Sequence, residues 1–373
     1  MSNSKVGIEF HAYDRTRAGT RGVENSLHRV GLAAIKLTAA YYALSRAISA
    51  GSSLARESMA YETGLARINT MLNAASERYL PQYDKQITHL AKTYGETATA
   101  LQSGAYDILS ATIAPADAMK VLEANVKAAK AGFTSTAIVT NASARVLKAY
   151  GLEASHTTEI LDDMQATVER GIITFEDVSS NVGNVIGLSA NLGVEIKAVM
   201  AAAASMTKAG LSADKTFMAL KNIFVTFMNP TEEARKAAEQ LGFSLDETSI
   251  KGAGLIKIVD KLRKANAKQL ESIMPNVRGM VGFAGMLANA TSVGEDYQYM
   301  LNSAGSVQDA FNKVVETSQF RADKLSERWK AVKRELGAPI AEAGITALER
   351  MADAMKAIQP SVDTRGDPWT QLK

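Results

Sequence analysis

Four histidines and two pairs of adjacent acids are the residues of this sequence whose types could carry out chemistry. The histidines are widely separated and no His-Glu-x-x-His motif occurs, so we expect surface or partly buried roles for them. They are His11, His28, His89 and His156. The acid pairs are Asp162-Asp163 and Glu232-Glu233. Neighbours on a helix point about 100° apart, so neither pair converges for acid–base work, and we predict solvated faces or helix-start charges.

The glycine patterns do not match any nucleotide-binding or nucleophile motif. Gly252-Ala-Gly254 lacks the third glycine of a dinucleotide loop, and neither a P-loop nor a Gly-x-Ser-x-Gly elbow occurs. Two other sets have the spacing that lets helices approach closely, and we predict that they pack tightly inside a core. These sets are Gly183 with Gly187, and Gly279 with Gly282 and Gly285.

The composition removes further classes of site. Cysteine is absent, which excludes disulfides, thiolate metal sites and cysteine nucleophiles. The charges nearly balance, with 42 basic and 39 acidic residues, so the net charge of +3 predicts no specific binding to nucleic acid. We therefore predict no catalytic, cofactor-binding or metal-binding residue, no cofactor, and a protein that is not an enzyme.

The composition indicates that the secondary structure of the chain is helical. The chain holds 61 alanines in 373 residues, only 6% aromatic residues and seven prolines. Alanine loses no side-chain entropy in a helix, whereas sheets favour aromatic and β-branched residues. The composition predicts an all-α protein, with long amphipathic helices flanking a compact bundle of short helices.

The N-terminal part divides into two segments. Residues 1–20 alternate apolar and polar side chains near their start and are predicted to form an extended arm. Residues 21–80 form a long helical segment, as one helix or two, in which apolar residues recur at helical spacing and Pro81 ends the pattern. The first of these apolar residues are Leu27, Val30, Ala34, Leu37, Tyr41, Leu44 and Ile48.

Residues 81–302 read as one compact helical unit. Glycines separate segments of about 15–20 residues, and Ser or Thr follows several of them, which is the punctuation of short helices. Residues 171–210 carry the fewest charges and are predicted to form the centre of the core.

Residues 303–358 form a second long helical segment, and residues 359–373 are predicted to be disordered. Gly337 and Pro339 are expected to kink or split the helix. The basic stretch Arg321–Arg334 is predicted to be a solvated face opposite the apolar residues. Those residues are Leu325, Trp329, Val332, Leu336, Ile340, Leu348, Met351, Met355 and Ile358.

The sequence shows no obvious membrane segment. Residues 1–10 lack the apolar run of a signal peptide, and the uncharged stretch 178–194 contains three Asn and three Ser. We expect a protein that is soluble when first made.

The order of several segments resembles the core region of phage tail tape measure proteins. The resemblance spans about residues 55–358, and the third of its four groups of stretches is the most specific. The stretches are 59–69 (MAYETGLARIN) with 90–100, 125–132 with 146–152 (VLKAYGL), 201–212 (AAAASMTKAGLS) with 219–224, 229–234 and 241–243, and 275–280 (PNVRGM).

The resemblance implies a non-enzymatic structural protein of phage tail assembly. Such a protein acts as a scaffold or ruler for tail tube polymerisation and assists genome delivery. The implied partners are tail tube and tail tip or baseplate proteins, tail assembly chaperones, and further copies joined through the long helices, whose apolar stripes would face partner chains. Membrane contact during delivery is also implied. The implied locations are the host cytoplasm during assembly and the lumen of the virion tail.

The chain stops soon after Ile358, whereas members of that family usually continue for hundreds of residues. A short tail, a truncated or processed piece, and a core used without a ruler are the three explanations. Two other functions remain open: a membrane-active or pore-forming helical protein, indicated by the sparsely charged residues 171–210, and a soluble helical adaptor.

Overall fold

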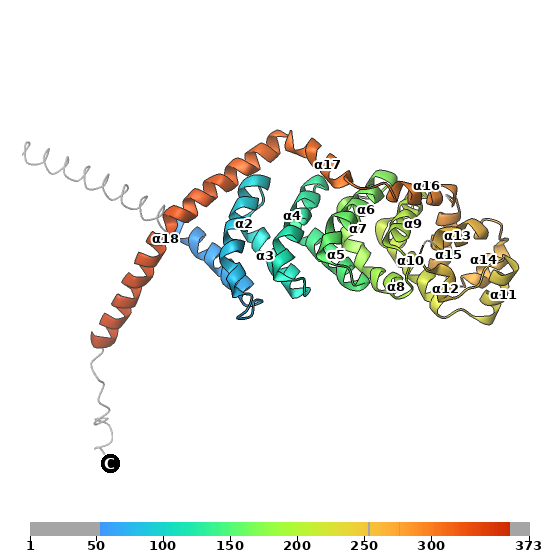
Figure 1. Ribbon diagram of the computed structural model, residues 1–373, viewed down its shortest axis with the longest axis horizontal. Coiled ribbons are helices and arrows are strands. Elements are labelled where there is room, and N and C mark those ends of the chain that lie inside the picture. Colours follow the sequence, from blue (N-terminus) through green and yellow to red (C-terminus); the bar gives the residue numbers. More distant parts are fainter. Residues whose placement is uncertain (1–52, 253, 276, 289, 359–373) are drawn as a thin grey trace, which may run out of the picture. The chain divides into compact units, whose positions relative to one another are not determined.

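The structure of this chain is a computed structural model that describes residues 53–252, 254–275, 277–288 and 290–358 (Figure 1). Within these residues it is all-α, as the composition predicts, and the one β interaction is an isolated bridge between Val194 and Gly252. The predicted arm 1–20, the apolar positions from Leu27 to Ile48 and the tail 359–373 lie outside the described residues.

The helices follow one another at short intervals. A first helix, without a label, covers residues 53–69. The others are η1 (Glu77–Tyr79), α2 (Leu80–Tyr94), α3 (Ala98–Ser110), α4 (Pro115–Ala131), α5 (Thr136–Tyr150), η2 (Ala154–His156), α6 (Thr157–Arg170), α7 (Phe175–Asn181), η3 (Val182–Asn184), α8 (Ile186–Asn191), α9 (Ile196–Lys208), α10 (Ala213–Met228), α11 (Glu232–Gln240), α12 (Glu247–Ile250), α13 (Gly254–Leu262), α14 (Ala267–Ile273), α15 (Val277–Ala288), α16 (Ala290–Met300), α17 (Ser306–Val315) and α18 (Ser318–Ile358).

Pro81 begins a helix, and the prediction that it ends one is wrong. The first helix stops at residue 69, and a turn in which Asn73 bonds the backbone of Ala75 and Ser76 separates it from η1. Pro81 then lies in the first turn of α2. Proline is favoured there because it has no N–H to leave unpaired and its fixed φ suits a helix.

The chain forms two compact units, residues 59–335 and residues 1–58 with 336–373. In the first unit, helices α2 to α10 pack as a row, each against near neighbours in the chain (Figure 1). The segment after α14 then returns along this row. Helix α15 packs on α10, α16 on α9, and α17 on α4 and α6. The return brings together residues more than a hundred positions apart.

The core is centred on α9, where every residue from Ala198 to Thr207 is buried. The prediction that residues 171–210 form the centre of the core is confirmed for α9, whose burial explains its low charge, whereas residues 171–197 include many exposed and half-buried positions. The low charge that favoured a membrane-active helix therefore has a structural cause. In the described part of the chain, no helix combines the length and apolar character needed to span a membrane.

Glycines allow some of these helices to pack closely. A Cβ at Gly282 of α15 would overlap the Cβ of Ala219 on α10, which confirms tight packing for the set with Gly279 and Gly285. The other pair is different. Gly183 lies in η3 and Gly187 in α8, and Gly187 is exposed with no atom within 4 Å of a Cβ, so the prediction that this pair packs tightly inside a core is wrong.

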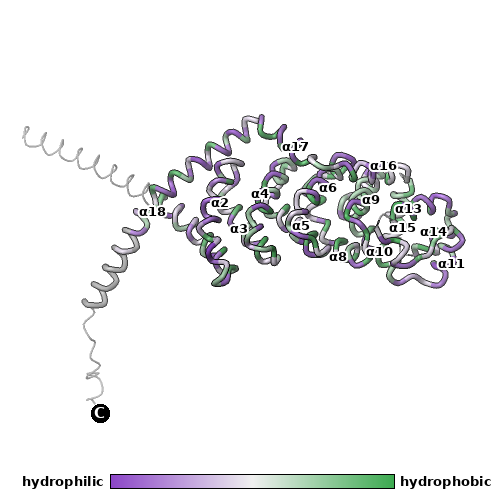
Figure 2. Tube along the Cα trace, viewed as in Figure 1, coloured by the Kyte–Doolittle hydropathy of each residue, from purple (hydrophilic) through white to green (hydrophobic). Residues whose placement is uncertain are grey.

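Helix α18 is a single helix of 41 residues that continues through Gly337 and Pro339, so of the two expected effects, a kink or a split, the split does not occur. Hydrophobic and hydrophilic residues alternate along the part of it that Figure 2 colours by hydropathy. Within the unit 59–335, its buried face carries Phe320, Glu327, Ala331 and Arg334, while Leu325, Trp329 and Val332 are exposed. The prediction of a solvated charged face is therefore wrong for Glu327 and Arg334. In the second unit, Gly337 approaches the backbone of Leu54 so closely that a Cβ would collide with it.

Candidate functional site

Three buried aspartates join the returning helices to the row that they cover. Asp162 and Asp163 lie on α6, and Asp296 lies on α16. Their exposed fractions are 3%, 0% and 0%. We call them the return aspartates. The prediction of a solvated face for Asp162-Asp163 is wrong because α17, which begins at Ser306 much later in the chain, packs over α6. Glu232 and Glu233 lie in the exposed first turn of α11, as predicted.

Asp162 caps the start of α17 from a different helix. Its carboxylate accepts hydrogen bonds from the backbone N–H of Gly305 at 2.8 Å and of Val307 at 2.9 Å. Gly305 is the N-cap residue and has no side chain to satisfy these donors. A carboxylate at this position also interacts favourably with the positive end of the helix dipole. Asp162 therefore fixes where α17 begins.

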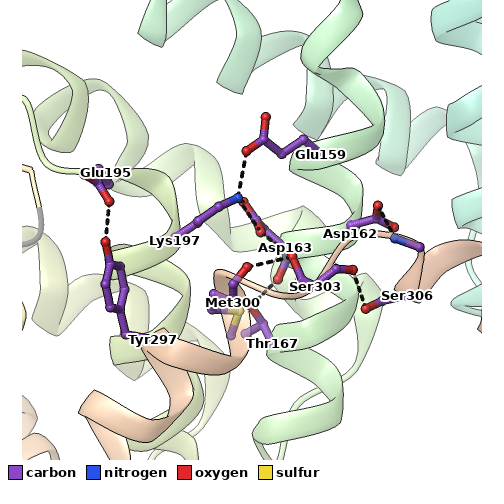
Figure 3. Close-up of polar contacts among 11 residues, drawn as sticks. Glu159, Asp162, Asp163, Thr167, Glu195, Lys197, Tyr297, Met300, Ser303 and Ser306 are labelled. Atoms are coloured by element: carbon purple, nitrogen blue, oxygen red, sulfur yellow. Dashed lines mark hydrogen bonds and ion pairs between the residues drawn. The ribbon is translucent and has the colours of Figure 1, made fainter.

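Asp163 forms the centre of a polar cluster between α6, α9 and the turn before α17 (Figure 3). Both carboxylate oxygens lie 3.0 Å from Nζ of Lys197, and the hydroxyl of Ser303 lies 2.8 Å from Oδ1. Lys197 also donates to Glu159 at 2.8 Å. An ion pair removed from water needs such extra hydrogen bonds, because desolvation costs as much as the charges gain.

Burial and charge act against each other in this cluster. Burial raises the pKa of Asp163 to about 6, although Lys197 and Ser303 both act to lower it. Burial acts to lower the pKa of Lys197, but Glu159 and Asp163 outweigh it, and the pKa is raised. The hydrogen bond from Lys197 lowers the pKa of Glu159. Lys197 is thus held as a cation, which is unsuited to act as a nucleophile.

Asp296 forms a second cluster further along the return. It lies 2.8 Å from Nε of Arg170 and 2.6 Å from Nζ of Lys208, and it accepts from Ser205 at 2.7 Å. Its neighbours thus come from the end of α6 and from α9. One residue later, Tyr297 donates to Glu195 at 2.5 Å, and burial, with this hydrogen bond, raises the pKa of Tyr297 to about 12.

These contacts build a structural site. Every carboxylate oxygen of the return aspartates accepts from at least one donor that lies on another element of the fold. Such an arrangement locks distant segments together. Sequence reasoning assigned Asp162 and Asp163 wrongly to a solvated face and did not single out Asp296. Among the described residues, no three His, Cys, Asp or Glu side chains cluster in a way that could hold a metal ion.

The two histidines in the described part of the chain lie at surface or partly buried positions, as expected. His89 is exposed and lies 3.4 Å from the hydroxyl of Thr93. His156 is partly buried, and its Nδ1 lies 3.5 Å from the hydroxyl of Ser155, which is longer than a base needs to activate a nucleophile. Ser155 lines an open hollow of about 750 Å³. In this hollow Lys148 donates a hydrogen bond to Thr112, and Lys120 forms an ion pair with Asp117.

Comparison with known proteins identifies the family. Residues 84–274, half of the chain, match the family described as phage-related minor tail proteins. A probable tape measure protein of Clostridium phage phiCD119 is 23% identical over 387 residues, which cover 92% of this chain and 39% of that protein. The chain thus spans about two fifths of the curated relative that it matches. No solved structure matches.

The matched residues run from α2 to the end of α14 and include the buried helix α9 and the two aspartates of α6. The relative extends the likeness over most of the chain and agrees with the resemblance drawn from the ordered segments. The chain belongs to the family of phage-related minor tail proteins.

Proposed function

We propose that this chain is a non-enzymatic structural protein of phage tail assembly that acts as a tape measure. It serves as a scaffold or ruler while the tail tube polymerises, and it assists genome delivery. The observation that carries this proposal is the family match over residues 84–274, joined by likeness to a probable tape measure protein over 92% of the chain.

The physical basis of a ruler is helix length. Each residue adds about 1.5 Å to an α-helix, so the 41 residues of α18 correspond to roughly 60 Å. The compact unit 59–335 suits a scaffold, because the return aspartates hold α16 and α17 to its centre. The curated relative is longer, and its remaining residues would supply further length.

The proposed partners are tail tube and tail tip or baseplate proteins, tail assembly chaperones, and other copies of the chain bound through the long helices. Assembly would take place in the host cytoplasm, and the finished protein would occupy the tail lumen. The division into an arm (1–20), a long helical segment (21–80), a core (81–302), a second long segment (303–358) and a tail (359–373) remains part of this proposal.

Tail length in the parent phage tests the ruler role. Twenty-eight residues of uninterrupted helical heptads, inserted after the exposed Thr346 of α18, extend the helix by roughly 42 Å. We expect electron microscopy to show tails lengthened by about this distance, rounded to whole rings of the tube.

The matched control places the same 28 residues after Gly242, an exposed glycine in the turn that follows α11. This insertion adds equal mass without lengthening α18, so tail length should stay at the wild-type value. Wild-type length with the insertion in α18, in tails that assemble normally, would contradict the ruler role.

A further inference from the structure

The first part of α18 has its polarity reversed relative to an ordinary surface helix. Leu325, Trp329 and Val332 are 69%, 59% and 42% exposed. On the face that packs against the protein, Glu327 and Arg334 are 2% and 9% exposed. Surface helices usually bury their apolar side chains and expose their charges. We call Leu325, Trp329 and Val332 the outer stripe.

Specific contacts hold the helix in this orientation. Arg334 lies over the ring of Tyr61 at 4.6 Å, whereas Glu327 pairs with Lys330 of the same helix at 2.7 Å. The backbone N of Lys324 sits against Gly95, where a Cβ would lie only 2.7 Å away. Even so, Glu327 Oε2 and Arg334 Nη2 are buried without a hydrogen-bond partner in the described residues. Burying these polar groups without hydrogen-bond partners costs free energy. In the isolated chain, the orientation of α18 that exposes the outer stripe therefore adds little stability.

The spacing of the outer stripe suits a helix. Its residues follow one another by four and then three positions, which is the seam that accepts the side chains of a second helix in a coiled coil. A helix that lies on a membrane surface instead presents a broad apolar face. Here the opposite side of α18 is attached to the protein, and the stripe is narrow.

The charges beside the stripe indicate the chemistry of that second helix. Arg321, Arg328 and Lys333 flank it, and none of them has an acidic partner within the described part of the chain. The nearby acids have other contacts, because Asp323 accepts from Gln319 and the exposed Glu335 lies 4.0 Å from Lys92. A second copy docked in parallel would set Arg328 opposite a lysine and add three more unpaired cations, so copies that associate through the long helices would use surfaces other than this stripe.

We propose that the outer stripe of α18 binds an amphipathic helix of a partner protein, apolar along one seam and flanked by Asp or Glu. The apolar seam covers Leu325, Trp329 and Val332, and the acids pair with Arg321, Arg328 and Lys333. This inference goes beyond the ruler role and does not depend on it, because binding is measured on the purified chain without tail assembly.

The test uses the full chain with Trp369→Phe, which leaves Trp329 as its one tryptophan. Two 21-residue heptad peptides with identical Leu and Ile seams are titrated, one flanked by Glu and one by Lys. We expect the Glu peptide to shift Trp329 emission to the blue and to bind about tenfold more tightly at low salt. Leu325→Ser should abolish the shift with unchanged far-UV circular dichroism, because Leu325 is exposed.

The charge-swapped variant Arg321→Glu/Arg328→Glu/Lys333→Glu is the matched control and should prefer the Lys peptide. Three results would overturn the proposal. The first is equal binding of the two peptides. The second is a dimer of the chain in sedimentation, with Trp329 shielded in the absence of any peptide. The third is a blue shift with anionic phosphatidylglycerol vesicles and none with either peptide.

Discussion

Asp163 shows how a residue that resembles surface charge in the sequence can work inside the fold. Its carboxylate is fully buried, and burial raises its pKa to about 6 against the pull of Lys197. The folded chain therefore holds a proton on Asp163 between about pH 4 and 6, where the unfolded chain has released it. Folding takes up a proton in this window, so acidification favours the folded state through this group.

The variant Asp163→Asn removes this titration. We expect the free energy of unfolding of the wild type, relative to the variant, to rise by up to about 3 kcal/mol from pH 7.5 to pH 4. Urea unfolding at a series of pH values measures it. For Glu159→Gln the same difference should stay flat between pH 5 and 7.5, because Glu159 is ionised in both states there. A flat profile for Asp163→Asn would show that Asp163 is ionised in the fold.

Asp296 gives a prediction that is independent of pH. The variant Asp296→Ala leaves Arg170 and Lys208 without their common anion, at side-chain exposures of 34% and 26%. Breaking a buried ion pair costs about 3–5 kcal/mol, and because both cations are partly hydrated we expect about 3 kcal/mol, measured by urea unfolding. Asp260→Ala, which breaks an exposed pair with Arg263, should change stability by less than about 0.5 kcal/mol. Equal losses would contradict the structural role of Asp296.

The return aspartates could not be identified from the sequence because their partners are remote. Asp162 bonds residues 143 and 145 positions away, and Asp296 bonds Arg170 from 126 positions away. One local signal was present: Asp162-Asp163 stands between Leu161 and Met164, both of which are buried. Helical periodicity describes the faces of a single helix, whereas the cover over α6 is set by the return path.

At the scale of elements, helix type was predictable and helix ends less so. Alanine content and glycine punctuation correctly predicted a bundle of short helices, and Thr174 and Thr231 cap helices as such residues do. Pro81 was misread because proline stops a helix in its interior and starts one in its first turn. The orientation of α18 could not be predicted either. An amphipathic pattern defines two faces of a helix, but tertiary contacts determine which of them is buried.

Gly95 connects the α2–α3 turn to α18. Its φ is +63°, and a Cβ would meet the backbone N of Lys324 at 2.7 Å. Gly151 has nearly the same φ, +62°, with no atom within 4 Å of a Cβ. We expect Gly151→Ala to cost about 1 kcal/mol from backbone strain alone, and Gly95→Ala to cost about 1–3 kcal/mol more because α18 is displaced.

Urea unfolding measures the two costs, and hydrogen exchange locates the difference. Amides in residues 320–335 should exchange faster in Gly95→Ala than in the wild type and be unchanged in Gly151→Ala. Equal stability losses in the two variants would mean that the contact between Gly95 and α18 contributes nothing beyond the glycine conformation.

For the molecule as a whole, the order of segments carried more information than any one motif. The resemblance to tape measure proteins rests on stretches from Met59 to Met280, and the family match falls inside that span. No pattern in the sequence showed that α15, α16 and α17 run back along the row, because each contact joins helices far apart in the chain. The return makes residues 59–335 one compact unit.

This unit should fold on its own. The described hydrophobic core runs from Ile68 to Phe320, entirely inside residues 59–335, and all three return aspartates lie there as well. Because burial of apolar area supplies most of the stability, we expect a fragment 59–335 to unfold cooperatively with a Tm within about 3 °C of the full chain. Differential scanning calorimetry of both proteins measures this. A matched fragment 59–302 lacks α17, Ser303 and the two N–H groups that donate to Asp162. Its Tm should be lower by at least 10 °C, or it should fail to fold. If 59–335 behaves like 59–302, the residues outside the unit contribute to its stability and the unit is not autonomous.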